Sequence, residues 1–209
     1  MTRVKICGIT TLEEARWAAA CGAEAIGFVF AKSPRRVAPE TAGAIMQEMG
    51  PFISGVGVFV DSPVEEVRRA MEASGCTVAQ LHGSEPESTI QALAPYAVIQ
   101  ALRVRGDLGA SMLTPSRMAR AILLDAYVED LPGGTGQRFD ASVAADLVRD
   151  GWRVIVAGGL TPENVGEVVR TVRPYGVDVG SGVEREPGRK DRDKVADFIA
   201  AVRAADGGR

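Results

Sequence analysis

Residues 3–30 of this 209-residue chain, RVKICGITTLEEARWAAACGAEAIGFVF, contain the first strand–helix–strand unit that the sequence predicts. Arg3–Cys7 is a short run with β-branched residues, which is typical of a strand. Thr10 or Thr11 is placed to cap a helix, because a threonine oxygen accepts hydrogen bonds from the free N–H groups of a first turn. Residues 25–30 predict a second strand, so the chain starts with one βαβ unit.

The same alternation of β-branched runs and amphipathic segments continues along the chain. Further strands are predicted at residues 53–60, 78–82, 97–104, 121–125, 153–157 and 177–179. Further helices are predicted from residue 39 and at residues 64–73, 85–93, 107–120, 142–149, 161–172 and 192–204, with the weakest pattern at 107–120.

Strict alternation indicates a parallel sheet, because each return to the same edge needs a crossover helix. An open, doubly wound sheet would alternate equally well. Eight complete units without a second domain favour closure instead. We therefore expect an α/β protein with a single (β/α)8 TIM barrel, forming one catalytic domain over residues 1–209.

The composition is that of a globular protein, with 46% hydrophobic and 24% charged residues and a formal net charge of −3. The sequence has no basic cluster dense enough for nucleic acid and no apolar run near the roughly 18 residues of a membrane span. We expect a cytoplasmic protein with a small-molecule partner. Three cysteines and one histidine without metal-like spacing indicate neither a metal site nor a disulfide framework.

Two ionisable side chains stand at the ends of predicted strands, where the active sites of such barrels collect. Period-2 alternation turns Cys7 into the barrel near its open end. Asp125 ends the sixth strand, across the barrel from the first, and a carboxylate there is costly to desolvate without a partner. Two facing proton carriers are what acid–base isomerisation requires. An inert buried thiol and a loop-capping aspartate are the alternatives.

Glycine-rich turns follow the last three predicted strands. Glycine lets backbone N–H groups approach an anion closely, and βα-barrels commonly hold a substrate phosphate in these loops. Tight turns without a ligand are the alternative. The candidate phosphate-binding residues are Gly134, Thr135, Gly136, Gly158, Gly159, Gly180, Ser181 and Gly182.

Five other polar side chains complete the candidate site. Arg35 and Arg36, after the second strand, offer a bidentate site for a carboxylate, although a solvated surface pair is the alternative. Gln80 and His82 share one face at the end of the fourth strand, and Asp178 faces inward from the eighth. These three either line the pocket or form hydrogen-bonded structural contacts.

Together these residues resemble the phosphoribosylanthranilate isomerase family of tryptophan biosynthesis. The resemblance covers the chain from residue 3 to about residue 190, in family order, and its first and last motifs are the most specific. The motifs are Lys5-Ile6-Cys7-Gly8-Ile9-Thr10, Gly27-Phe28-Val29-Phe30, Ser33-Pro34-Arg35-Arg36-Val37, Gly57-Val58-Phe59-Val60, Gln80-Leu81-His82-Gly83, Leu124-Asp125, Gly133-Gly134-Thr135-Gly136, Phe139-Asp140, Gly158-Gly159-Leu160, Asn164-Val165 and Val177-Asp178-Val179-Gly180-Ser181-Gly182-Val183-Glu184. Ala141 replaces the tryptophan usual in the family, a departure that removes a packing residue near the sixth loop.

The resemblance implies an Amadori rearrangement of N-(5-phosphoribosyl)anthranilate to 1-(2-carboxyphenylamino)-1-deoxyribulose 5-phosphate, without a metal or organic cofactor. By position, Asp125 is the general acid at the furanose ring oxygen and Cys7 is the general base at sugar carbon 2. Arg35, or Arg36 in another loop register, fits the anthranilate carboxylate, and the glycine loops fit the phosphate.

A basic Cys7 needs a stabilised thiolate, since a free thiol has a pKa of about 8.5. We predict that the pKa of Cys7 is lowered, with Lys5 below it and the Arg35 loop above it as candidate causes.

A sugar-phosphate epimerase, a histidine-pathway isomerase and an indole-forming synthase are rival enzymes. A barrel that binds a phosphorylated ligand without turnover is the rival outside enzymes, and the oligomeric state stays open between monomer and homodimer.

Overall fold

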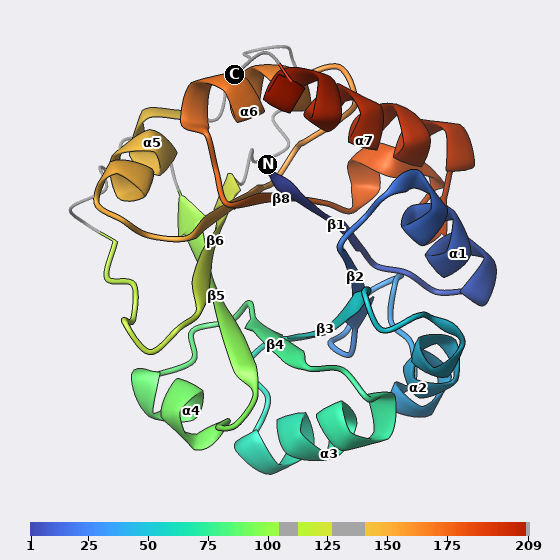
Figure 1. Cartoon of the computed structure of the whole chain (residues 1–209). Coiled ribbons are helices and arrows are strands. Elements are labelled where there is room, and N and C mark those ends of the chain that lie inside the picture. The colour runs from blue at the N-terminus through green and yellow to red at the C-terminus, as the bar shows by residue number, and fades with distance from the viewer. Residues whose placement is uncertain (105–112, 127–140, 208–209) are drawn as a thin grey trace, which may run out of the picture.

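The structure is a computed structural model that describes residues 1–104, 113–126 and 141–207. Eight parallel strands close into a barrel in the order β1 to β8, with β8 paired to β1. Figure 1 looks into the barrel and shows the helices as an outer ring around it. The predicted closed βα-barrel is therefore confirmed.

The elements follow the predicted order with small differences at their ends. The barrel strands are β1 (Arg3–Cys7), β2 (Ala25–Val29), β3 (Ser54–Phe59), β4 (Val78–Leu81), β5 (Ala97–Val104), β6 (Ala121–Ala126), β7 (Val154–Ala157) and β8 (Gly176–Val179). The helices are α1 (Leu12–Cys21), α2 (Pro39–Glu48), α3 (Val64–Ser74), α4 (Glu87–Ala92), α5 (Ala141–Arg149), α6 (Val165–Val172) and α7 (Arg192–Gly207). The loop after β8 holds a short 3-10 turn, η2 (Ser181–Val183), and an antiparallel ribbon of β9 (Glu184–Glu186) and β10 (Arg189–Lys190).

The helix predicted at residues 107–120 is wrong where the structure describes it. Residues 105–112 lie outside the described part of the chain, and residues 113–120 are irregular, with a turn at residues 117–118 and no helix. Pro115 disfavours helical backbone at the residue before it. Ser116 then holds a turn, because its hydroxyl accepts a hydrogen bond from the Met118 N–H at 3.1 Å. The described residues thus contain seven α-helices rather than the predicted eight.

Helix α1 begins with a reciprocal cap, and the capping residue is Thr11 rather than Thr10. The Thr11 hydroxyl accepts from the Glu14 N–H, and the Glu14 carboxylate accepts from the Thr11 N–H. Glu14 also accepts from the Lys190 N–H at 2.9 Å, so this buried carboxylate joins the start of α1 to the ribbon after β8.

Side chains on the strands alternate between two apolar regions. Outward-facing residues such as Val4 and Ile6 pack into the large core beneath the helices. A second cluster, made only of strand residues, fills the barrel interior. Its buried members are Val56, Ile99, Ala101, Ala121, Leu123, Ile155 and Ala157. Asp125 has the same alternation as Ala121 and Leu123, so its side chain also turns inward.

The two ends of the chain are joined by hydrogen bonds beside the first strand. Thr2 donates from its backbone N–H to the Asp206 carboxylate at 2.6 Å. The Arg203 guanidinium group donates to the carbonyls of Thr2 and Gly22 at 2.7 and 2.8 Å, and pairs with Glu24 at 2.7 Å. We call these contacts the terminal clasp. Among the described residues, no helix has the length and apolar character to cross a membrane.

Candidate active site

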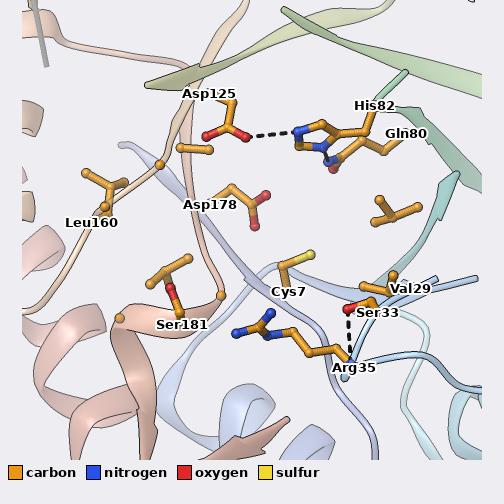
Figure 2. Close-up of a pocket in the computed structure, with 17 residues that line it drawn as sticks. Cys7, Val29, Ser33, Arg35, Gln80, His82, Asp125, Leu160, Asp178 and Ser181 are labelled. Atoms are coloured by element: carbon orange, nitrogen blue, oxygen red, sulfur yellow. Dashed lines mark hydrogen bonds and ion pairs between the residues drawn. The ribbon is translucent and has the colours of Figure 1, made fainter. Parts of the chain in front are cut away.

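A cavity of about 270 Å³ opens at the carboxyl ends of the strands, which is room for one small molecule. It brings together most of the predicted site residues. These are Cys7, Arg35, Gln80, His82, Asp125, Gly158, Gly159, Asp178, Gly180, Ser181 and Gly182. Figure 2 shows the side chains of Cys7, Asp125 and Asp178 pointing into one shared space.

Four predicted residues do not lie on the described wall of this pocket. Gly134, Thr135 and Gly136 lie outside the described residues. Arg36 is exposed and is not among the residues that line the cavity, although its backbone forms a β-bridge with Val29. Of the two arginines, the structure therefore places Arg35 at the pocket.

The Cys7 side chain fits inside the barrel because the residue beside it on the neighbouring strand is a glycine. A Cβ atom added at Gly27 on β2 would lie 2.9 Å from the Cys7 sulfur and 3.1 Å from the Lys5 ammonium nitrogen. The Lys5 ammonium group donates to Asp178 at 2.9 Å, and both side chains are buried. Cys7 thus lies above a buried ion pair formed across the β1–β8 junction.

The predicted lowering of the Cys7 pKa is wrong for this structure. Burial of the thiol raises its pKa above the ordinary value, and the nearby Lys5 ammonium group opposes this only in part. For Lys5, burial acts to lower the pKa, but the carboxylate of Asp178 and the adjacent Cys7 outweigh it and the pKa is raised. Lys5 therefore stays charged and is available to stabilise a thiolate when one forms.

Asp125 faces Cys7 from β6 and is held by the only histidine in the chain. His82 Nε2 lies 2.9 Å from Asp125 Oδ2, and His82 Nδ1 lies 3.0 Å from the side-chain nitrogen of Gln80. The dashed lines in Figure 2 follow this chain of contacts from β4 to β6. Because a quarter of the Asp125 side chain is exposed, the carboxyl group keeps access to a ligand in the pocket.

Arg35 reaches the pocket past a glycine and is paired with Glu184. A Cβ atom at Gly8 would lie 2.6 Å from Arg35 Cδ, so the first loop needs glycine here, where φ is also +78°. The Arg35 guanidinium donates from Nε and Nη2 to the two Glu184 oxygens, each at 2.7 Å. This bidentate pair orients the arginine and does not involve Nη1.

Glu184 and Lys190 are functional-site neighbours that sequence reasoning did not single out as site residues. Lys190 is fully buried, and its ammonium group donates to Glu184 at 2.9 Å and to the Gly180 carbonyl at 3.0 Å. Burial acts to raise the pKa of Glu184, but Arg35 and Lys190 together hold it below the usual range. Glu184 is the last residue of a specific family motif, so the sequence did contain a signal that it belongs to the site. Lys190 lies among exposed charged residues, and nothing in the sequence marked it as a site residue.

The loops after β7 and β8 lie against each other and form one wall of the pocket. Gly158 and Gly159 adopt left-handed backbone with φ of 82° and 64°. Gly182 packs on the Leu160 carbonyl so closely that no side chain would fit. Among the described residues, no group of three or more histidine, cysteine, aspartate or glutamate side chains is placed to hold a metal ion.

The comparison with known families agrees with this geometry. A family model described as N-(5'phosphoribosyl)anthranilate (PRA) isomerase matches residues 4–201. The chain belongs to this family. The predicted family and enzyme class, an isomerase, are therefore confirmed.

Similar members of the phosphoribosylanthranilate isomerase family cover almost the whole chain. The N-(5'-phosphoribosyl)anthranilate isomerase of Geobacter sp. (strain M21) is 48% identical over 204 residues, which is 97% of this chain and 98% of the relative. The crystal structure of phosphoribosyl anthranilate isomerase from Thermus thermophilus is 45% identical with a TM-score of 0.86, covering 97% and 99% of the two chains.

Another structure of the family was solved with a ligand. It is described as phosphoribosyl anthranilate isomerase in complex with reduced 1-(o-carboxyphenylamino)-1-deoxyribulose 5-phosphate. It is 38% identical to this chain with a TM-score of 0.83, and the match covers 98% of this chain and 100% of the relative.

Proposed function

We propose that this chain catalyses the Amadori rearrangement of N-(5-phosphoribosyl)anthranilate to 1-(2-carboxyphenylamino)-1-deoxyribulose 5-phosphate in L-tryptophan biosynthesis. The observation that carries the proposal is that Cys7 and Asp125 line one pocket of a member of this isomerase family. A proton donor and a proton acceptor on the two sides of a sugar are the groups that this isomerisation needs.

The reaction divides between the two residues. Asp125 gives a proton to the furanose ring oxygen, the bond from that oxygen to sugar carbon 1 breaks, and the nitrogen lone pair forms a protonated imine. The Cys7 thiolate then removes the proton from carbon 2, and the electrons of that bond form an enolamine. The enolamine becomes the ketone when its hydroxyl loses a proton and carbon 1 gains one.

The buried ion pair beneath Cys7 supports the second step. A buried thiolate is penalised by desolvation, and the Lys5 ammonium group offsets part of this penalty. Asp178 holds Lys5 in place through the 2.9 Å contact. The resting thiol is therefore neutral, and the base is the thiolate that forms beside this fixed cation when the thiol releases its proton to solvent.

The proposed substrate has two anionic groups, a carboxylate and a phosphate. The pocket has a cationic side chain for the first and loops rich in backbone N–H groups for the second. Arg35 has Nη1 outside its pair with Glu184, and this N–H group is assigned to the anthranilate carboxylate. The glycine loops at residues 158–159 and 180–182 are assigned to the phosphate, together with Gly134, Thr135 and Gly136.

Two buried acceptor atoms support a ligand with several hydrogen-bond donors. Gln80 Oε1 and Asp178 Oδ1 have no hydrogen-bond partner among the described residues, and both side chains line the pocket. Unpaired buried oxygens are costly, so a bound ligand is expected to satisfy them. The proposed substrate carries two ribose hydroxyls and an anilino N–H, which are donors of this kind.

The decisive experiment follows anthranilate-type fluorescence after N-(5-phosphoribosyl)anthranilate is mixed with the parent protein, Cys7→Ser and Asp125→Asn. We expect turnover by the parent and a loss of about 10²-fold or more in kcat for each folded variant. Saturable binding without any turnover by the parent would instead identify a phosphorylated-ligand-binding barrel. Circular dichroism of all three proteins controls for folding.

We further infer a cytoplasmic enzyme that takes a small phosphorylated molecule as its partner and needs no nucleic acid, membrane or cofactor. The chain is expected to be a monomer or a homodimer. The solution mass, at one or two times 22.0 kDa, is the measurement that decides between the two states.

A further inference from the structure

Asp125 is attached to a chain of hydrogen bonds that no step of the proposed reaction uses. Gln80 Nε2 lies 3.0 Å from His82 Nδ1, and His82 Nε2 lies 2.9 Å from Asp125 Oδ2. The histidine therefore stands between a buried amide and the carboxyl group that acts as the acid. Figure 2 shows His82 and Gln80 on the same side of the pocket, with a nitrogen of the His82 ring toward Asp125.

The barrel fixes the first two members of this chain. Gln80 belongs to β4, is paired with Val58 on β3 and Ile99 on β5, and is 1% exposed. His82 follows directly after β4, and its backbone N–H donates to the Phe59 carbonyl at 2.8 Å. An amide enclosed in this way cannot exchange its partner for solvent, so its orientation constrains the histidine ring.

The chemistry of the amide then decides where the ring carries its proton. A primary amide nitrogen donates hydrogen bonds and does not accept them, so His82 Nδ1 is the acceptor and has no proton. A neutral imidazole with a bare Nδ1 carries its hydrogen on Nε2. The Nε2–H group therefore donates to Asp125 Oδ2.

We propose that Gln80 and His82 are positioning residues that select which oxygen of Asp125 delivers the proton. Oδ2 is occupied as an acceptor, so the acid proton of Asp125 is carried by Oδ1. The same contact prevents rotation of the carboxyl group away from the ligand. This inference rests on the proposed role of Asp125 as general acid and adds a cause for its orientation.

If the Gln80 amide were turned the other way, the donors and acceptors along this chain of contacts would be reversed. With the Gln80 oxygen facing the ring, Nδ1 would carry the proton and Nε2 would be an acceptor. Asp125 would then donate its proton from Oδ2 to the histidine, and that proton would point away from the substrate. The position of the proton on the ring therefore distinguishes the two arrangements.

The chain has one histidine, so the test needs no assignment of signals among several rings. The parent protein is labelled with ¹⁵N-histidine, and its ring nitrogens are measured by long-range ¹H–¹⁵N correlation at neutral pH without substrate. We expect a protonated Nε2 and an unprotonated Nδ1. A protonated Nδ1, alone or together with Nε2, would overturn the proposal.

The variant Gln80→Met tests the amide itself, because methionine keeps the length of the side chain and removes the N–H donor. We expect both ring nitrogen signals to move toward the values of a mixture of the two tautomers. Ring signals identical to those of the parent would show that Gln80 does not fix the tautomer. Thermal unfolding of the variant controls for a general loss of structure.

The variants His82→Asn and His82→Gln test the contact with Asp125. A glutamine amide reaches the place of Nε2 and can donate to Oδ2, whereas an asparagine amide is too short. We expect His82→Asn to lower kcat roughly 10- to 100-fold with little change in KM, and His82→Gln to recover most of the loss. Parental kcat in His82→Asn, or an equal loss in both variants, would contradict the positioning role.

These measurements separate this inference from the proposed function. The nuclear magnetic resonance experiment uses no substrate, so a parent protein that shows the expected tautomer but no turnover would refute the function alone. A parent with turnover and a protonated Nδ1 would refute the positioning role alone.

Discussion

The thiol of Cys7 shows how packing and chemistry make different demands on one side chain. Packing encloses the sulfur among strands, which raises its pKa and keeps it neutral. The proposed reaction needs the thiolate. Lys5 reconciles the two demands, because its own raised pKa keeps an ammonium group beside the sulfur throughout the ordinary pH range. A neutral resting thiol also resists oxidation and alkylation, which require the thiolate.

This arrangement predicts the pH dependence of the proposed base. A raised pKa leaves a smaller thiolate fraction at neutral pH, and that fraction increases as the pH rises. We expect the rate at which iodoacetamide alkylates Cys7 in the free protein to keep increasing with pH beyond the pKa of an ordinary free thiol. Mass spectrometry of the alkylated peptide gives this rate. A plateau of the rate below neutral pH would contradict the raised pKa.

At this scale the sequence predicted which residues reach the pocket better than how they behave there. Strand alternation placed Cys7 on an inward face, and the end of the sixth strand placed Asp125 across the barrel from it. Asp178 was predicted to face inward from the eighth strand, and the structure has all three residues at the pocket. The direction of the Cys7 pKa shift was wrong, since it depends on the balance between burial and the distance to Lys5 in three dimensions. The pairing of Arg35 with a residue 149 positions away was equally invisible in one dimension.

The close contact between helices α2 and α3 depends on a single glycine. Gly43, buried in the middle of α2, lies against the Ala73 backbone carbonyl of α3, and an added Cβ atom would overlap that oxygen. Backbone cannot move aside as a flexible side chain can. The separation of the two helices is therefore set by the absence of a side chain.

The substitution Gly43→Ala is expected to destabilise the protein by about 1–3 kcal/mol through overpacking, even though alanine has the higher helix propensity. Gly50→Ala is the matched control, because Gly50 is exposed and an added Cβ atom would meet nothing within 4 Å. Urea unfolding followed by circular dichroism measures both changes. Equal urea midpoints for the two variants would contradict this prediction, because they would show that α2 and α3 can move apart without a loss of stability.

At the scale of elements, the sequence predicted the type and order of structure more reliably than the ends. The helix predicted from residue 161 begins as α6 only at Val165. The Asn164 side chain explains the delay, because it accepts from the Thr161 N–H and donates to the Gly159 carbonyl. Such side-chain contacts replace the backbone bonds of a first helical turn, and they hold the loop that borders the pocket.

Closure of the barrel brings together strands from the two ends of the chain. Strand β1 pairs with β8 over four residue positions, and Lys5 and Asp178 are opposite each other in that register. Counting eight units in the sequence was enough to predict closure. The terminal clasp was not predictable, because its contacts join residues about 180 to 204 positions apart.

The terminal clasp should contribute measurably to the stability of the whole barrel. Arg203→Ala removes donors to the carbonyls of Thr2 and Gly22 and the pair with Glu24. We expect a loss of about 1–3 kcal/mol in the free energy of unfolding. Arg192→Ala on the exposed start of the same helix is the control and should change it by less than about 0.5 kcal/mol. Matching unfolding curves for both variants would show that the clasp contributes nothing.

The clasp has a further consequence for how the chain can be connected. It holds Thr2 and Asp206 in direct contact, so a short linker could span the distance between the two ends. A circularly permuted chain, joined there and opened at an exposed turn such as the one at Gly50, would retain every strand pairing of the barrel. The order of the βα units around the axis and their order of synthesis are therefore separate properties of this protein.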